Sequence, residues 1–162
     1  TKGENIRPTI RWEGAPKETQ SFALIIADPD VPADFTDAGK DGKILDADMP
    51  RQLFYHWALV DIPADFTAIE GGNARKNPAV GKALKNDLAA YVPNPRQYGG
   101  PCPPWNDLRL HHYYFTVYAL DVPTLKLKPN ATARDAVEAL KAHTLRSGEV
   151  VATYALNPAL RR

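Results

Sequence analysis

The chain has 162 residues, which is enough for one domain with its own hydrophobic core. Its 20 basic and 19 acidic side chains give a formal net charge of +1, without the basic patch that nucleic acid or an anionic membrane surface attracts. No apolar run reaches the roughly 18 residues of a membrane-spanning helix. The single cysteine, Cys102, excludes an internal disulfide framework.

The first strands are expected before residue 65. Residues 9–12 form a short strand, and residues 21–28 (SFALIIAD) form a strong one. Alternation along a strand places four side chains on one face of that segment: Phe22, Leu24, Ile26 and Asp28. The polar segment 31–51 is expected to be an extended surface loop.

The second apolar strand is expected at residues 54–61 (FYHWALVD). Period-2 alternation predicts that His56, Ala58 and Val60 share one of its faces. Residues 80–91 are compatible with a short helix. Residues 113–121 are rich in aromatic and β-branched side chains and predict a third strong strand.

The clearest helix signal lies at residues 132–145. Thr132 and Asp135 have the spacing of a capping box, apolar side chains follow at helical intervals, and Gly148 can end the helix. Residues 149–156 then return as a strand. Strands with little helix between them favour antiparallel pairing. The expected fold is therefore mostly β: a single-domain antiparallel β-sandwich over residues 1–162 with one C-terminal helix.

The segment 98–121 carries the clearest functional signal. Its Gly-Pro-Cys-Pro-Pro loop at residues 100–104 has a backbone too rigid to enter a sheet ladder. His111 follows at the mouth of the aromatic strand. A stiff loop beside a polar side chain at a strand end is suited to form one wall of a small-molecule pocket.

Two further strand segments carry polar side chains on apolar faces. Asp28 ends the first strong strand on its core side, and His56 lies inside the second. A buried carboxylate has to be paired, hydrogen-bonded or bound to a ligand. We expect Asp28, His56 and His111 to lie within contact distance of one another. A turn-capping Asp28 and a core His56 are the alternatives for each residue taken singly.

In these motifs the chain resembles the phosphatidylethanolamine-binding protein family, also called the Raf kinase inhibitor-like family, and in particular its bacterial branch. The resemblance covers nearly the whole chain and rests on the order and spacing of five segments. These are Gly-Glu-Asn-Ile-Arg-Pro at 3–8 with Trp12, Ser-Phe at 21–22 leading to Asp-Pro-Asp-Val-Pro at 28–32, Tyr-His-Trp at 55–57, Gly-Pro-Cys-Pro-Pro at 100–104, and His-His-Tyr at 111–113.

The resemblance implies a β-sandwich with a small anion-accepting pocket for phosphate, phosphoethanolamine or similar head groups. It carries the family's pocket residues over onto Asp28, Asp30, His56, Pro103, Pro104, His111 and Tyr113. Pro103 and Pro104 would form the pocket wall. No cofactor or metal is implied. A protein partner is suggested by analogy with eukaryotic relatives, and fold-level analogy is weak evidence of function.

The chain departs from the family pattern in several places. Arg7 stands where the family usually has Ser, His112 stands where Arg is common, and the loop 32–54 is longer than in the shortest bacterial members. The family also has a leading segment with a strand before the motif at residues 3–8. We expect the domain to lack that strand, and its sheet to expose an unpaired edge and an uncovered apolar strip.

The electrostatics of such a pocket can be argued from residue types alone. Two carboxylates beside a phosphate repel a dianion, so a monoprotonated or zwitterionic head group is favoured. A histidine in its imidazolium form can donate to a phosphate oxygen. Binding that depends on an imidazolium weakens as the pH rises through the histidine pKa.

Three other classes of function remain as alternatives. A metal site would need His56, His111, His112 and Asp28 together, but adjacent histidines on a strand point in opposite directions. A hydrolase would need a nucleophile, and neither Cys102 nor the two serines lie in a nucleophile motif, so we expect no enzyme. A module that inhibits a kinase or protease is the third. We expect a cytoplasmic protein, or a periplasmic one if a signal segment preceded residue 1.

Overall fold

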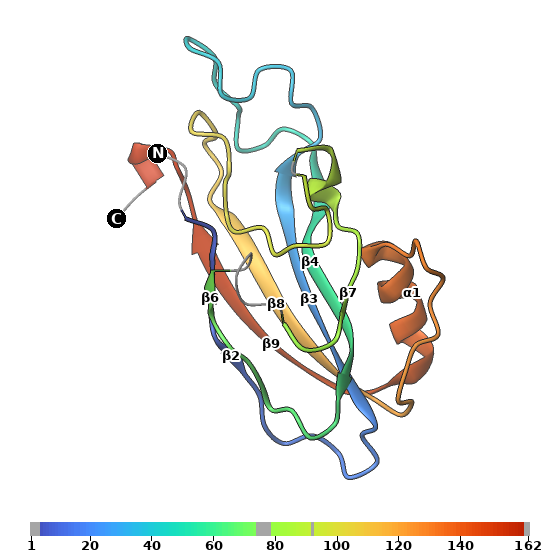
Figure 1. The fold of residues 1–162 in the computed structure, drawn as a ribbon. Coiled ribbons are helices and arrows are strands. Elements are labelled where there is room, and N and C mark those ends of the chain that lie inside the picture. Colours follow the sequence, from blue (N-terminus) through green and yellow to red (C-terminus); the bar gives the residue numbers. More distant parts are fainter. Residues whose placement is uncertain (1–3, 74–78, 92, 161–162) are drawn as a thin grey trace.

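A five-stranded antiparallel sheet forms the centre of the computed structural model, which describes residues 4–73, 79–91 and 93–160. Its strand order is β7-β4-β3-β8-β9 (Figure 1). The strand bounds are Lys82–Ala83 for β7, Arg51–Pro63 for β4, Ser21–Pro32 for β3, His111–Leu120 for β8 and Thr144–Tyr154 for β9. The long central strands are those that the apolar sequence segments predict.

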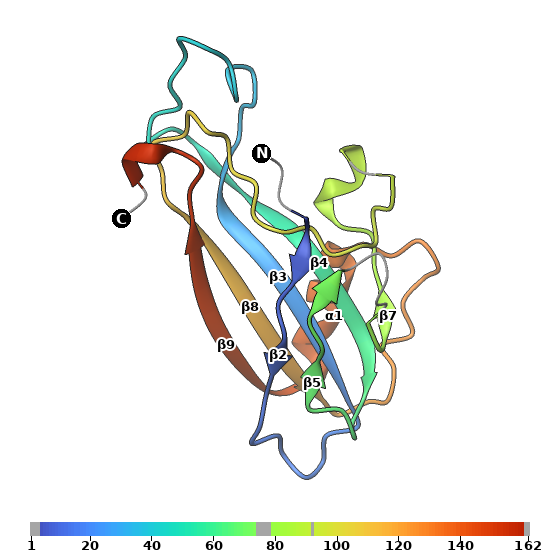
Figure 2. The ribbon, with the colours of Figure 1, turned by 60° about the vertical axis from the view of Figure 1, so that its left-hand side comes forward.

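Two short ladders cover one face of this sheet. β1 (Ile6–Arg7) pairs with β6 (Gly72–Asn73), and β2 (Ile10–Arg11) pairs with β5 (Ala68–Ile69). Figure 2 shows β2 and β5 in front of the large sheet. The side chains between the two layers form one hydrophobic core: Ile10, Phe22, Leu24, Ile26, Trp57, Leu59, Ile62, Ile69, Tyr98, Tyr113, Phe115, Val117 and Ala119.

The other face of the sheet is covered by the helix α1 (Ala133–His143). Thr132 caps its N-terminus, and the reciprocal bonds with Asp135 form the predicted capping box. The apolar side chains of α1 pack on a second core that includes Ala58 and Val60. The predicted antiparallel sandwich with one main helix is therefore confirmed. In the described part of the chain, no helix has both the length and the apolar character needed to cross a bilayer.

Two sequence-based element assignments are wrong. The helix considered for residues 80–91 is replaced by β7 and a short 3-10 helix, η1 (Asp87–Ala90), because the backbone of 82–83 pairs with β4. The C-terminal strand begins at Thr144 rather than at 149, directly after α1. Thr144 caps the helix end by donating its hydroxyl proton to the Leu140 carbonyl, so Gly148 lies within β9. A second 3-10 helix, η2 (Pro158–Leu160), follows β9.

A β-bulge in β4 changes the face of His56. Ile26 of β3 pairs with Trp57, but the next residue, Ala27, pairs with Tyr55, so His56 is the extra residue in the ladder. Its ring then lies 5.2 Å from that of Tyr113, on the face opposite to Ala58. The predicted sharing of a face by His56, Ala58 and Val60 is therefore wrong, because a bulge interrupts strict alternation.

The strand β9 forms one edge of the large sheet. All of its residues are exposed, and no described strand pairs with its outer side. Between β9 and the segment 10–15 lies an apolar groove of about 360 Å³, lined in part by Trp12, Phe22, Phe115, Val117 and Val150. That a missing leading strand accounts for this unpaired edge stays a prediction.

Candidate functional site

His111 begins β8 and lies almost fully buried between two carboxylates. Its Nδ1 lies 2.6 Å from Asp28 Oδ2, and its Nε2 lies 3.2 Å from Asp107 Oδ2. Ionised carboxylates only accept, so both ring nitrogens donate and the ring is an imidazolium. Burial alone would lower the pKa of His111, but the hydrogen bonds to Asp107 and Asp28 outweigh it and raise this pKa to about 9.

Asp107 links His111 to Arg51. The Arg51 guanidinium donates to both carboxylate oxygens, at 2.6 and 3.0 Å, and the Arg109 backbone N–H donates at 2.8 Å. Burial would raise the pKa of Asp107, but its bonds to His111 and Arg51 lower this pKa to about 2. Sequence reasoning missed Asp107 and Arg51. The sequence did hold one signal for them: if His111 and Asp28 are buried, charged partners for them have to exist elsewhere in the chain.

Asp28 ends the regular part of β3 and, like His111, lines a cavity that is described below. Its Oδ1 accepts the backbone N–H of Asp30 at 2.7 Å, and its Oδ2 accepts from His111. Burial together with the nearby Asp28 charge raises the pKa of the Tyr113 hydroxyl above its ordinary value. Asp28 is thus a buried carboxylate held by two donors, the Asp30 N–H and the His111 ring, as a buried charge requires.

His56 has a different environment on the other side of β3. Its Nδ1 lies 3.0 Å from the Gly99 carbonyl oxygen, which can only accept, so Nδ1 carries the proton. Burial lowers the pKa of His56, against the opposing effect of Asp28, and favours the neutral ring. Its Nε2 is then an acceptor. This buried atom has no hydrogen-bond partner among the described residues and lies 4.0 Å from Asp28 Oδ2.

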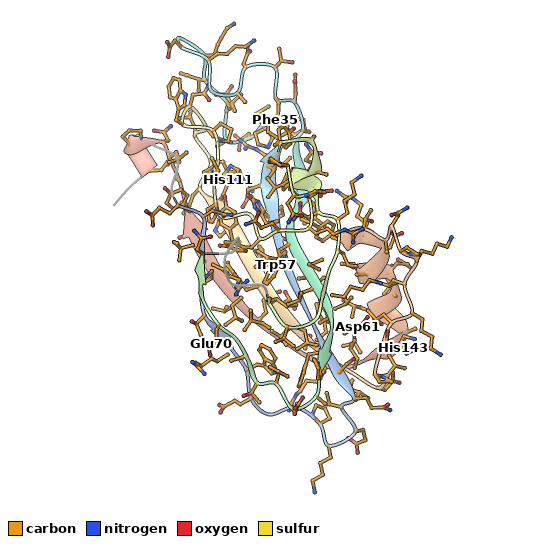
Figure 3. The ribbon with its side chains drawn as sticks, viewed as in Figure 1. Phe35, Trp57, Asp61, Glu70, His111 and His143 are labelled. Carbon is orange, nitrogen blue, oxygen red and sulfur yellow. The ribbon has the colours of Figure 1, made fainter. Side chains whose placement is uncertain are left out.

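The two histidines line one cavity of about 260 Å³. Figure 3 shows His111 toward the same end of the molecule as Phe35, away from Asp61 and His143. The cavity wall is mostly apolar and includes the Pro-rich loop. Its lining residues are Asp28, Val31, Phe35, Phe54, His56, Leu88, Tyr91, Gly100, Cys102, Pro103, Pro104, His111 and Tyr113. Of the seven residues predicted for the site, six line this cavity.

Asp30 is the exception, because its carboxylate is bound on a neighbouring network. It accepts from Arg109 Nε at 2.6 Å and from the backbone and ring of His112 at 2.9 and 2.8 Å. These bonds lower the pKa of Asp30 against the effect of burial. A second irregularity, between Asp28 and Val31, turns Asp30 away from the cavity. His112 points to the opposite side of β8 from His111, as strand alternation predicts.

Asparagine side chains that sequence reasoning did not single out hold the loops around His56. Asn5 donates to the Tyr98 carbonyl and accepts from the Gly100 N–H, both at 2.8 Å, and it has a positive φ of 56°. Asn86 donates to the carbonyls of His56 and Gln97. The unusual Arg7 is structural, because its buried guanidinium donates to the Glu70 carbonyl and lies over the Trp57 ring.

The polar floor of the cavity, which Asp28, His56 and His111 form, therefore presents hydrogen-bond acceptors. His111 cannot donate to a ligand while both of its nitrogens donate to Asp28 and Asp107. Neutral His56 offers a lone pair at Nε2, and Asp28 offers carboxylate oxygen. A ligand must bring a proton donor, or it must bind together with a proton that makes His56 an imidazolium. Within residues 4–73, 79–91 and 93–160, no group of three His, Cys, Asp or Glu side chains is placed to hold a metal ion.

Comparison with known proteins identifies the family. The family model described as phosphatidylethanolamine-binding protein matches residues 1–155. A UPF0098 protein of Methanothermobacter thermautotrophicus is 33% identical over 153 residues, covering 94% of this chain and 84% of that relative. UPF0098 protein YbcL of Escherichia coli is 29% identical over 157 residues, covering 94% of this chain and 73% of that relative.

Solved structures agree with this assignment. The crystal structure of E. coli YbcL, described as a new member of the mammalian PEBP family, has a TM-score of 0.73 and 28% identity, covering 94% of this chain and 82% of that chain. The putative phosphatidylethanolamine-binding protein homologue CT736 of Chlamydia trachomatis has a TM-score of 0.65 and 30% identity, covering 92% and 80%. The resemblance drawn from the motifs is confirmed, and the chain belongs to the phosphatidylethanolamine-binding protein family.

Proposed function

We propose that this protein binds a small phosphate-containing head group of the phosphoethanolamine type. The polar atoms of the cavity would accept hydrogen bonds from donors of the ligand. The observation that carries the proposal is the buried Nε2 of His56, a residue that lines a cavity of about 260 Å³, because this atom has no hydrogen-bond partner in the described part of the chain. Most buried polar atoms are hydrogen-bonded. An unsatisfied one in a cavity marks a position where a ligand atom belongs.

The charge arrangement selects the form of the ligand. Asp28 and His111 compensate each other, and Asp107 and Arg51 do the same, so the floor has little net charge to attract a bare dianion. A phosphate dianion would instead face the Asp28 carboxylate and the His56 lone pair. A monoprotonated phosphate or a primary ammonium supplies the donor that these two acceptors need. Phosphoethanolamine carries both an ammonium and a phosphate.

The cavity volume sets the size of the group that enters. Ligand pockets for drug-sized molecules measure about 300–1,000 Å³. At about 260 Å³ this cavity suits a head group rather than a whole lipid. Phe35, Phe54 and Leu88 give it an apolar wall, which excludes water around the polar floor and strengthens each hydrogen bond made there.

We also propose that the site binds without catalysing a reaction. His111, the candidate general acid or base, would have to break a bond to Asp28 or Asp107 before it could exchange a proton with a substrate. Ser21 donates to the Val122 carbonyl, far along β3 from the cavity. Incubation with phosphoethanolamine should therefore release no phosphate above the rate without protein. Sustained release that depends on His56 would replace this proposal with a hydrolase.

The binding test compares two variants of His56. In His56→Asn the amide nitrogen can take the place of Nδ1 and keep the Gly99 bond, but nothing remains at the position of Nε2. In His56→Gln the amide reaches toward Nε2 and the Gly99 bond is lost. By calorimetry with phosphoethanolamine, we expect His56→Asn to bind at least about tenfold more weakly than wild type, the free energy of one charge-assisted hydrogen bond.

His56→Gln should bind more tightly than His56→Asn, because it retains a polar atom near the ligand. Thermal unfolding of both variants provides the control for folding. Equal affinity of wild type and His56→Asn would overturn the proposed role of Nε2. Absence of heat with wild-type protein, phosphoethanolamine and inorganic phosphate alike would overturn the proposed ligand class.

A further inference from the structure

Cys102 is the single thiol of the chain, and it lines the same cavity as His56. Free cysteine is among the residue types that are most often buried in folded proteins. Cys102 is instead an exposed residue of the cavity wall. It is also close enough to Tyr113 for its charge to affect the pKa of that hydroxyl.

The backbone around Cys102 is held in place. Pro101 and Pro103 flank it and fix their own φ angles. The Gly100 N–H donates to Asn5, and the Gly99 carbonyl accepts from His56. The loop therefore cannot move far from the cavity without breaking these bonds, and the position of the thiol is set relative to the floor.

A second observation, separate from the thiol, points to a ligand here: within the described residues, the buried His56 Nε2 has no hydrogen-bond partner. The His56 side chain is 7% exposed. Cys102 and His56 both line a volume of about 260 Å³, so a head group bonded to Nε2 leaves little room for a further group attached to the sulfur. Occupancy by ligand and substitution on sulfur should exclude each other.

We propose that Cys102 is a modification site that closes the cavity by reversible thiol–disulfide exchange with a low-molecular-weight disulfide. The Cys102 thiol loses its proton, and the thiolate attacks one sulfur of the disulfide. A new S–S bond joins Cys102 to half of the reagent, and the other half leaves as a thiolate that takes up a proton. The inference rests on the proposed function for its consequence, the loss of head-group binding.

The chain itself cannot reverse this step. Since the sequence has no second cysteine, no resolving thiol of the same chain can displace the adduct. An external thiol is required, which makes occupancy of the cavity depend on the ratio of thiol to disulfide in the surroundings.

The test uses 2-hydroxyethyl disulfide as the reagent. Intact-mass measurement should show one adduct per chain, and the adduct should lower the affinity for phosphoethanolamine at least tenfold, with recovery after dithiothreitol. Saturating phosphoethanolamine should slow the modification at least threefold. The matched control is the double variant Cys102→Ser, Ser147→Cys, which moves the thiol to an exposed position on β9. Modification of this control variant should leave its affinity for phosphoethanolamine unchanged. Phosphoethanolamine should in turn leave the rate of that modification unchanged.

A second measurement does not depend on the proposed ligand. The chain has four histidines, so their ring signals can be resolved by NMR in histidine-labelled protein. The adduct should shift the His56 signals and leave those of His143, which bonds to Asp121 beside α1, unchanged. If unmodified protein binds no phosphoethanolamine, the proposed function fails while a His56 shift still supports the modification site. An adduct that alters neither the His56 signals nor the affinity would overturn the inference.

Discussion

His56 and His111 lie on either side of β3 in one cavity, and the surroundings of their ring nitrogens are opposite. Both nitrogens of His111 donate to carboxylates, which stabilises its charged form. His56 donates once to a backbone carbonyl, and its other ring nitrogen is an acceptor that no described residue pairs. Two histidines that look equivalent in the sequence therefore have different surroundings: His111 joins strands through both ring nitrogens, and His56 has the acceptor to which we assign the ligand in the proposed function.

The comparison also changes the role expected for His111. The residue types predict that an imidazolium at His56 or His111 holds an anion, but both ring protons of His111 are committed to Asp28 and Asp107. In the proposed function His111 would act on the ligand only indirectly, because it fixes the Asp28 carboxylate beside His56. Loss of His111 contacts should therefore affect stability first, whereas loss of the His56 acceptor should affect binding.

The largest effect is expected from Asp107→Ala. Removal of this carboxylate leaves the buried positive charges of His111 and Arg51 without a shared partner, and breaking such a buried pair costs about 3–5 kcal/mol of unfolding free energy. Urea unfolding measures it. Asp37→Ala is the matched control, because its ion pair with Lys43 is exposed and 3.9 Å long. Exposed pairs contribute about 0–1 kcal/mol. Equal losses in the two variants would remove the distinction between a structural network and a surface pair.

Stability should also depend on pH in the direction set by His111. Its folded pKa of about 9 lies above the ordinary 6.5, so its stabilisation is complete below pH 6.5 and is lost as the pH rises through 9. The expected loss is on the order of 3 kcal/mol. Asp107, with a folded pKa of about 2, stabilises above its ordinary 3.8, and this contribution is lost as the pH falls toward 2.

His56 acts in the opposite sense to His111. Because burial lowers its pKa, the unfolded chain takes up a proton near pH 6.5 that the folded chain does not, which reduces stability at lower pH. Measured by urea unfolding, the unfolding free energy should fall less steeply below pH 6.5 in His56→Asn than in wild type. A wild-type profile that stays level between pH 6.5 and 9 would contradict the charged state assigned to His111.

Ligand binding should show the pH dependence of His56 rather than that of His111. Inorganic phosphate becomes a dianion near neutral pH, and the Asp28 carboxylate repels this dianion unless His56 is an imidazolium, so its affinity should fall about tenfold or more from about pH 5 to 8. Ethanolamine supplies an ammonium to a neutral His56 and should bind more tightly over the same range. Calorimetry measures both ligands. If the affinities for phosphate and ethanolamine changed in the same way with pH, the polar floor of the cavity would not present hydrogen-bond acceptors.

The smallest effect is expected from Asn5→Gly. Glycine keeps the positive φ of this position but removes both side-chain bonds to the loop at residues 98–100. We expect a loss of about 1–2 kcal/mol in unfolding free energy and a modest loss of affinity, because the loop also holds His56. Thr36→Ala, which removes a bond to Asp34 in an exposed loop, serves as the control. An unchanged affinity would show that the loop does not need Asn5 to position His56.

Much of the fold follows from local patterns. The apolar segments that became β3, β4 and β8, and the capping box of α1, are local signals that tertiary packing did not override. The short elements after residue 80 were misassigned, because a two-residue strand has too little pattern to be detected and forms only when β4 provides its partner. The start of β9 was also missed, since pairing with β8 rather than local propensity decides where that strand begins.

The sequence by itself determined which residue types meet at the ends of the central strands: a carboxylate after β3, a histidine within β4, a stiff loop and a histidine at the start of β8. Only the tertiary structure decided what each of them does. The bulge at His56 turned its ring toward Tyr113, and Asp107 with Arg51 saturated His111. Alternation and propensity are properties of neighbours along the chain. Bulges and charge pairing depend on residues that only folding brings together, and these decided which ring nitrogen has no hydrogen-bond partner among the described residues.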